Sequence, residues 1–200
     1  VQIQPMKMAA AEALWESEDP AAMSLFTIGD VENLEDVFAI RVPCLLSIMA
    51  YNKCDGEVKG IKNLQAEFEE IYGPGNYIPP VAVSYWTFRI MIGAGVVMAL
   101  LAFYSLYLIW RNKVGMHPRF LQLLVLSILL PYLANSAGWL FTEIARQPWI
   151  VYGLQKTADG VSLNVSAGTV AFSLIGFTVL YGALMVAEIY LLVKFAKRGV

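Results

Sequence analysis

Residues 85–110, YWTFRIMIGAGVVMALLAFYSLYLIW, form the stretch that decides the fold. Arg89 is the only charged residue in it. The stretch is longer than the roughly 20 apolar residues that a helix needs to cross the hydrocarbon core of a bilayer. We therefore predict a transmembrane helix over residues 81–111.

Two further stretches have the same character: residues 120–145, FLQLLVLSILLPYLANSAGWLFTEIA, and residues 169–193, TVAFSLIGFTVLYGALMVAEIYLLV. Pro131 predicts a kink in the second helix, which neighbouring helices tolerate inside a membrane bundle. The third helix is expected over residues 167–194. The predicted fold class is an all-α integral membrane protein, with three transmembrane helices as part of a larger helical bundle.

The composition supports membrane residence and divides the chain into two parts. The chain is 58% hydrophobic and 15% charged, whereas about a quarter of the residues in soluble proteins are charged. Only three of the 16 acidic residues lie beyond position 80, which leaves 13 in residues 1–80 against five basic ones. No basic stripe interleaved with aromatic residues is present to bind phosphates, so nucleic acid is not an expected partner.

The basic residues indicate how the chain is oriented. RNKVGMHPRF separates the first two spans, and KFAKRGV follows the third. The positive-inside rule places the loop over residues 112–119 and the tail over residues 195–200 on the cytoplasmic side. Residues 1–80 and the loop over residues 146–166 are then extracytoplasmic.

The acidic front segment, residues 1–80, is expected to carry short helices on the membrane surface. Residues 5–16 contain strong helix formers, and residues 61–72 repeat an apolar face at helical spacing. Residues 41–51 are too short to cross the bilayer and are either packed or re-entrant. The chain opens with Val1 rather than Met, which favours a fragment of a longer protein.

Arg89 and Met91 stand near the start of the first span. They are two positions apart, so on a helix they point about 200° away from each other. Arg89 is either a functional charge or an arginine that snorkels to the interface. Met91 is either a ligand or ordinary core filling.

Glu143 and Arg146 close the second span and lie three positions apart, on one helical face. One interpretation is an interfacial ion pair. The other is a functional carboxylate, because an acidic side chain at the membrane centre costs about 2.5 to 3.5 kcal/mol and persists where something positive requires it. Trp139 shares this face and is either a packing residue or part of the site.

The remaining candidates are weaker. Glu188 is expected to make a structural contact near the end of the third span. His117 is the only histidine and has no partner at metal-ligand spacing, so a metal role is not expected. Cys44 and Cys54 form either a disulfide or two free thiols.

Three motifs together resemble a known family. QPMKMAAAEALWES near the start, YWTFRIM in the first span and AGWLFTEIARQPWIVYG around the end of the second are similar to the larger, haem-bearing subunit (subunit I) of cytochrome bd quinol oxidases. The resemblance covers essentially all 200 residues, as the C-terminal half of that subunit. It implies a multi-pass protein of the prokaryotic cell membrane.

The resemblance implies three haem cofactors: a low-spin haem b, a high-spin haem b and haem d. Met91 would be a ligand of the low-spin haem b iron, and Glu143 a ligand of the high-spin haem b iron. Arg89 would lie beside the low-spin haem as a charge that favours its reduced form. Trp139 would lie among the haems, and Arg146 would hold propionates or the Glu143 carboxylate.

The front segment resembles the family's quinol-binding loop, and the resemblance places Lys7 and Glu12 at the quinol site. A carboxylate can accept a proton of the quinol while an ammonium steadies the charge on its oxygen; a plain surface salt bridge is the alternative. The implied enzyme is a quinol:oxygen oxidoreductase. It would generate membrane potential without pumping, because quinol protons are released outside while oxygen reduction consumes protons from inside.

The remaining haem ligands are expected in an N-terminal half of the subunit that this chain lacks. Further expected partners are a second, haem-free membrane subunit, small accessory membrane subunits, the lipid bilayer, oxygen, and either menaquinol or ubiquinol. The alternative class is a non-catalytic membrane scaffold or transporter fragment, in which Arg89, Glu143 and Glu188 are ordinary polar contacts of a bundle.

Overall fold

The computed structural model describes residues 3–113, 118–162 and 164–198. The chain divides into two compact units, Val1–Asp159 and Gly160–Val200, and each is described by itself. His117 lies outside the described residues.

Three helices among the described residues are long and apolar enough to cross a membrane: Val81–Trp110, Pro118–Ile144 and Ala167–Lys197. The prediction of three spans is confirmed. The first is a single helix, α4 (Val81–Trp110), which begins directly after Pro80. Proline suits the start of a helix, because the first amide groups of a helix have no partner within it and the N–H that proline lacks is not missed there.

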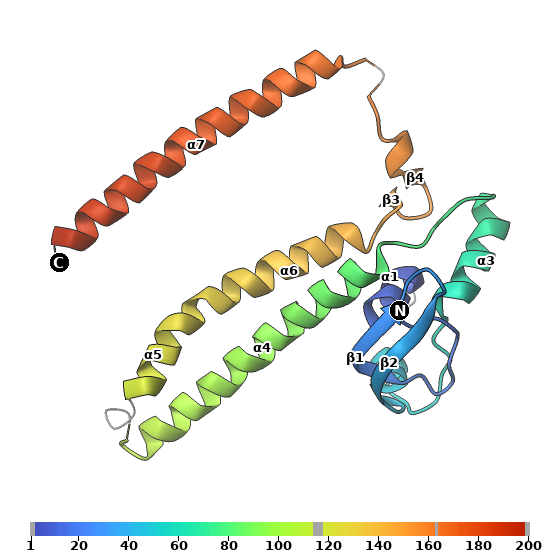
Figure 1. The fold of residues 1–200 in the computed structure, drawn as a ribbon, viewed down its shortest axis with the longest axis horizontal. Helices are drawn as coiled ribbons and strands as arrows, with labels where there is room; N and C mark the ends of the chain where they lie inside the picture. Colours follow the sequence, from blue (N-terminus) through green and yellow to red (C-terminus); the bar gives the residue numbers. More distant parts are fainter. Residues whose placement is uncertain (1–2, 114–117, 163, 199–200) are drawn as a thin grey trace. The chain divides into compact units, whose positions relative to one another are not determined.

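The second span is interrupted at the predicted place. It consists of α5 (Pro118–Leu126), a single 3-10 turn, η2 (Ser127–Leu129), and α6 (Leu130–Ile144). Pro131 lies in the first turn of α6. Because proline has no amide hydrogen and clashes with the preceding turn, the α-helical ladder cannot continue through it. Figure 1 shows the change of direction between α5 and α6.

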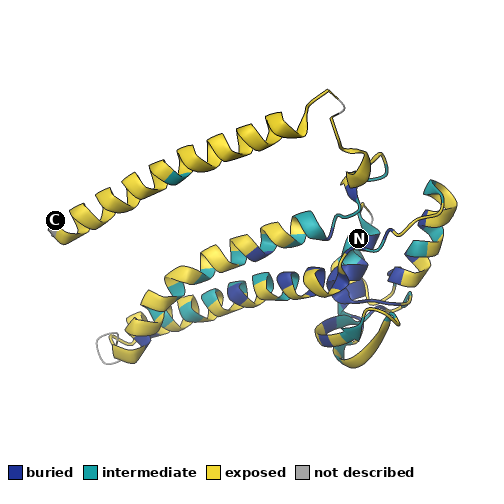
Figure 2. Cartoon of the chain, turned by 45° about the horizontal axis from the view of Figure 1, so that its top comes forward, coloured by how far each residue is buried: buried dark blue, intermediate teal, exposed yellow. Residues whose placement is uncertain are grey.

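Helices α4 and α6 pack side by side (Figures 1 and 2). The rings of Phe88 and Phe141 meet with their centroids 4.9 Å apart. Near the other end of α4, Tyr104 makes an edge contact with Phe120 of α5 at 4.8 Å. Aromatic contacts at both ends hold this helical hairpin together.

The front segment contains the expected short helices and, in addition, two strands that the sequence did not predict. Helices α1 (Pro5–Glu12), α2 (Leu45–Tyr51) and α3 (Ile61–Tyr72) are present. Between α1 and α2 lies an antiparallel hairpin of β1 (Met23–Asp30) and β2 (Glu35–Val42). Valine, isoleucine, threonine and phenylalanine recur in these strands, and such residues fit a pleated, half-buried surface.

Helix α1 lies at the centre of the front segment. Ala9, Ala10 and Ala11 are completely buried, and small side chains allow close approach of the neighbouring elements. The core around α1 extends to Tyr77 in the linker and to Trp149 after the second span. Figure 2 shows this concentration of buried residues around α1.

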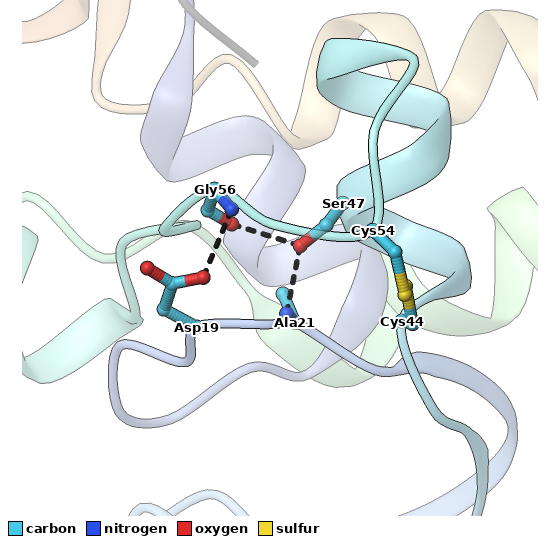
Figure 3. Close-up of a disulfide and its surroundings, with 6 residues drawn as sticks. All are labelled: Asp19, Ala21, Cys44, Ser47, Cys54 and Gly56. Atoms are coloured by element: carbon cyan, nitrogen blue, oxygen red, sulfur yellow. Dashed lines mark hydrogen bonds between the residues drawn. A yellow bond between two sulfur atoms is a disulfide. The ribbon is translucent and has the colours of Figure 1, made fainter.

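A disulfide joins Cys44 and Cys54, which decides between the two alternatives left by the sequence. It closes the loop around α2 (Figure 3). Beside it, the Ser47 hydroxyl donates to the Gly56 carbonyl at 2.8 Å and accepts from the Ala21 amide at 2.8 Å. The disulfide region is thereby attached to the chain that enters β1.

The second span ends in a short hairpin of β3 (Trp149–Val151) and β4 (Gln155–Lys156), followed by a 3-10 turn, η3 (Thr157–Asp159). In the other unit, α7 (Ala167–Arg198) is a single helix whose side chains are almost all exposed (Figure 2). Within this unit, no ion pair involves Glu188 among the described residues.

Candidate functional site

The front segment and the first span are joined by a buried ion pair. Arg89 of α4 donates from Nη2 to Glu12 Oε2 at the end of α1, over 2.8 Å. The side chain of Glu12 is 1% exposed and that of Arg89 is 12% exposed. A buried pair of this kind is strongly destabilised when one partner is lost, because the other charge is then left uncompensated.

Ser24 of β1 holds both members of this pair through its backbone. Its amide donates to Glu12 Oε2 at 2.9 Å, and its carbonyl accepts from Arg89 Nη2 at 2.6 Å. Its hydroxyl forms hydrogen bonds with Thr27 Oγ1 at 2.7 Å and with Tyr85 OH at 2.8 Å. These three hydroxyl residues, Ser24, Thr27 and Tyr85, are here called the hydroxyl chain, and all three are buried.

Burial raises the pKa of the Glu12 carboxyl above its ordinary value. The positive charge of Arg89, its hydrogen bond and the Ser24 amide oppose this effect but do not cancel it. Glu12 therefore takes up a proton at a higher pH than an ordinary glutamate. This direction suits a group that must receive a proton from a substrate.

The buried ion pair is not saturated with hydrogen bonds. Among the described residues, Glu12 Oε1 and the Nε and Nη1 atoms of Arg89 have no partner. The guanidinium lies 4.6 Å from the centroid of the Tyr85 ring and 5.3 Å from that of Phe88. The cluster thus retains an acceptor atom and two donor atoms for groups outside this part of the chain.

A second charged cluster lies at the end of α6. Arg146 Nη2 is ion-paired with Glu143 Oε2, and the two side chains are 32% and 41% exposed. Lys7 of α1 lies 4.9 Å above the Phe141 ring. Burial and the charge of Arg146 lower the pKa of the Lys7 ammonium, and Glu143 opposes them.

Lys7 and Glu12 therefore belong to different clusters. They are five positions apart on α1, so their side chains point about 140° away from each other. Glu12 contacts Arg89 and Ser24, whereas Lys7 faces the Phe141 ring.

Met91 faces α6. A Cβ atom added at Gly138 would lie 2.8 Å from the Met91 sulfur, so the absence of a side chain at Gly138 makes room for the thioether. Arg89, two residues earlier, contacts the front segment instead. Trp139, on the face of α6 that also carries Glu143, is 64% exposed.

The family model for cytochrome bd terminal oxidase subunit I matches residues 1–200. The chain belongs to the cytochrome bd terminal oxidase subunit I family. The predicted family is confirmed.

Individual relatives agree. The chain is 51% identical over 197 residues to the cytochrome bd ubiquinol oxidase subunit 1 of Bacillus subtilis, covering 98% of this chain and 42% of that protein. It is 30% identical over 255 residues to the cytochrome bd-II ubiquinol oxidase subunit 1 of Escherichia coli, covering 99% and 49%. The bd oxidase structure from Geobacillus thermodenitrificans matches with a TM-score of 0.77 at 32% identity, covering 100% of this chain and 43% of that one. The chain spans less than half the length of these relatives.

Four residues that contribute to the two clusters were not singled out from the sequence: Ser24, Thr27, Tyr85 and Phe141. Tyr85 and Phe141 stand within apolar spans, where an aromatic residue has no distinguishing signal. Ser24 and Thr27 lie on the buried side of β1, and the strand itself was not predicted. The available signal was the presence of two hydroxyl residues inside a strand-forming stretch. Buried hydroxyl groups require hydrogen-bond partners, so such a pair indicates a buried polar cluster.

Proposed function

We propose that the complete subunit to which this chain contributes oxidises quinol at the extracytoplasmic face and delivers the electrons to oxygen. The observation that carries this proposal is the buried Glu12–Arg89 pair. It places a proton-accepting carboxyl of the front segment in direct contact with the first membrane span. The names of the Bacillus and Escherichia relatives, both ubiquinol oxidases, support the same activity.

Quinol oxidation requires a group at the site that accepts protons. Each quinol loses two electrons and two protons as it becomes quinone, and two quinols reduce one oxygen molecule to two molecules of water. Glu12 is proposed to accept one of the protons. Arg89 keeps the Glu12 carboxylate oriented and limits the rise of its pKa, so that the group can release the proton again.

The haem groups, when bound, supply the one-electron steps and the iron at which oxygen is reduced. The residues of this chain fit such groups. Met91 offers a thioether, a known haem ligand, and the absence of a side chain at Gly138 makes room for its sulfur. The buried Arg89 Nε and Nη1 and the Arg146 Nε have no partner among the described residues, and guanidinium groups suit carboxylates such as propionates.

The assignment of individual residues to haems follows the family resemblance. Met91 would hold low-spin haem b and Glu143 high-spin haem b, with Trp139 beside the haems. Haem d and the remaining ligands would be carried by the N-terminal half of the subunit. Arg89 and Arg146 would balance propionate charge.

Glu12 is the stronger candidate of the two proposed quinol residues. One small ring cannot hydrogen-bond to both Lys7 and Glu12 while they lie in separate clusters. Glu12 is buried beside a cation and has an unpartnered oxygen. Lys7 is proposed to act at longer range, through its charge near Glu143 and Arg146.

The proposed topology follows the distribution of basic residues. Residues 1–80 and 146–166 face the extracytoplasmic side, and residues 112–119 and 195–200 the cytoplasm, with the predicted spans 81–111, 120–145 and 167–194 between them. Protons released by quinol then leave outside while oxygen reduction takes protons from inside, which generates membrane potential without pumping. The proposed partners are a second, haem-free membrane subunit and small accessory subunits.

The test is a reduced-minus-oxidised visible spectrum of the purified complex, combined with oxygen consumption driven by quinol. We expect bands of b-type and d-type haem and oxygen uptake that depends on added quinol. A complex without these bands, or one that consumes oxygen only with an artificial donor, would refute the proposed function.

A further inference from the structure

We propose that the β1–β2 hairpin lies in the surface layer of the bilayer and that one of its faces contacts lipid. This inference concerns the attachment of the front segment to the membrane and does not depend on the proposed function. The face consists of four apolar side chains, which are between 39% and 52% exposed: Phe26 and Ile28 of β1, and Phe38 and Ile40 of β2. They are here called the apolar face.

The strand register places these four side chains on one side of the hairpin. Phe26 pairs with Ile40, and Ile28 pairs with Phe38; residues directly opposite each other in an antiparallel pair lie on the same face. The rings of Phe26 and Phe38 meet with their centroids 6.3 Å apart. The other side of β1 is covered, since Thr27 is only 2% exposed. The hairpin thus has one uncovered side, and a contiguous apolar surface of this kind indicates a partner.

The hairpin runs alongside the first turns of α4. At the start of β1, the Ser24 carbonyl accepts a hydrogen bond from Arg89. At the tip of the hairpin, Val31 lines the same cavity as Val81, the first residue of α4. Helix α4 rises about 12 Å from Val81 to Arg89. The start of β1 is therefore the end of the hairpin nearer to the membrane interior, and the tip is the end farther from it.

The length of α4 fixes the depth of the apolar face. The helix has 30 residues and is therefore about 45 Å long, whereas the hydrocarbon core is roughly 30 Å thick. Charged loop residues follow Trp110, so the hydrocarbon ends near Trp110, and about 20 residues counted back from it reach Met91. Trp86 stands about one and a half turns farther out, in the interfacial layer where tryptophan is enriched. The rings of Phe26 and Trp86 are 5.4 Å apart, so the apolar face lies in this layer too.

The distribution of charge along the hairpin favours lipid as the partner. The tip, residues 30–35, contains three acidic residues among six, whereas residues 23–29 and 37–40 contain no charged residue. Polarity therefore rises from the end nearer to the hydrocarbon to the end farther from it. A bilayer surface requires this order, because charged side chains are unfavourable at depth. A protein partner that covered the hairpin would not require it.

The apolar face continues into an exposed stripe of the first span. Trp86, Ile90, Val97 and Leu100 share one side of α4 at helical spacing and are between 42% and 62% exposed. Residues 23–42 carry four acidic residues and one basic residue, so attraction to anionic headgroups does not hold the hairpin to the membrane. The contact is apolar, and zwitterionic lipid should be sufficient for it.

Spin labels on the hairpin test its depth. The variants Phe38→Cys and Glu32→Cys of the complete complex are labelled with a nitroxide and reconstituted into phosphatidylcholine vesicles; Cys44 and Cys54 are bonded to each other and take no label. Power saturation then compares collisions with oxygen, which concentrates in lipid, and with a water-soluble nickel complex. We expect oxygen to dominate at position 38 and nickel at position 32. A label at position 38 that meets mainly nickel, or neither reagent, would overturn the inference.

Photocross-linking identifies what touches the apolar face. The photoreactive residue p-benzoylphenylalanine replaces Phe38 in the complete complex, or Glu35 near the tip of the same strand as the matched control. After illumination in the same vesicles, mass spectrometry should find lipid adducts for position 38 and none for position 35. Adducts of position 38 with another polypeptide segment of the complex, in place of lipid, would contradict the inference. Neither experiment depends on whether the complex oxidises quinol.

Discussion

The two Arg–Glu ion pairs of this chain are built in opposite ways. Glu12 and Arg89 are 77 positions apart and come from the front segment and the first span, and their side chains are 1% and 12% exposed. Glu143 and Arg146 are neighbours on one helix, and their side chains are 41% and 32% exposed. The first pair joins two parts of the fold, whereas the second is a local feature of a helix end.

This contrast determines what each pair contributes. A buried ion pair adds little to the stability of the fold compared with an apolar pair of the same shape. Loss of one partner is strongly destabilising, because the other charge remains buried without compensation. An exposed pair contributes little and is screened by salt. The Glu12–Arg89 pair therefore makes the position of the front segment dependent on the first span, and the Glu143–Arg146 pair leaves its carboxylate accessible.

The largest effect is expected for Arg89→Leu. It leaves the Glu12 carboxyl buried without its cation, which should destabilise the complex by about 3–5 kcal/mol. The measurement is denaturation of the purified complex, monitored by intrinsic fluorescence. The double variant Glu12→Leu with Arg89→Leu should recover much of this loss, since no buried charge is then left alone. Equal destabilisation in the single and double variants would show that the charges are not coupled.

Glu12→Gln should give the next largest effect, on activity. The amide has almost the shape of the carboxyl but cannot accept the quinol proton, so quinol-driven oxygen uptake should fall about 10²–10⁴-fold. Oxygen uptake with an artificial electron donor should be retained, as should the haem bands. Parallel loss of both activities would instead indicate a structural role.

The contrast between the pairs also explains how much could be predicted. Glu143 and Arg146 stand three positions apart on a predicted helix, so their pairing follows from helical geometry. The helices at Pro5–Glu12 and Ile61–Tyr72 follow equally from local composition and spacing. The pairing of Glu12 with Arg89 depends on tertiary structure, and no periodicity links positions 77 residues apart.

The β1–β2 hairpin was missed for a related reason. The strand register shifts between Ser24 and Phe26 and again between Ile28 and Gly29. These irregularities interrupt the alternation of buried and exposed residues that marks a strand in a sequence. Without the hairpin, Ser24 and Thr27 have no assigned place, and the hydroxyl chain of Ser24, Thr27 and Tyr85 does not follow from the sequence.

The pH dependence of the rate of quinol oxidation tests the buried Glu12–Arg89 pair without a substitution. Because burial raises the pKa of Glu12, the carboxyl becomes protonated, and unable to accept a proton, at a higher pH than an ordinary glutamate does. The rate with quinol should therefore fall as the pH decreases through this raised pKa, while the rate with an artificial donor should not follow it.

Stability should change in the opposite direction in the same range. The folded protein binds the Glu12 proton more tightly than the unfolded chain does, so the contribution of this group to stability rises as the pH falls. In Arg89→Leu the acid limb of the quinol rate should move to higher pH, because the charge of Arg89 lowers the pKa of Glu12. An acid limb at the same pH in this variant would assign the titration to another group.

The smallest effect is expected for Arg146→Gln at the exposed pair. Because both side chains are about one-third exposed or more, the loss of stability should be about 0.3–0.5 kcal/mol, the value for pairs on one helix face. It should shrink further as the salt concentration rises, whereas the loss in Arg89→Leu should persist, since salt screens buried charges much less. Denaturation of both variants at low and high salt makes this comparison. A salt-independent loss of several kcal/mol in Arg146→Gln would mean that other parts of the purified complex bury the Glu143–Arg146 pair.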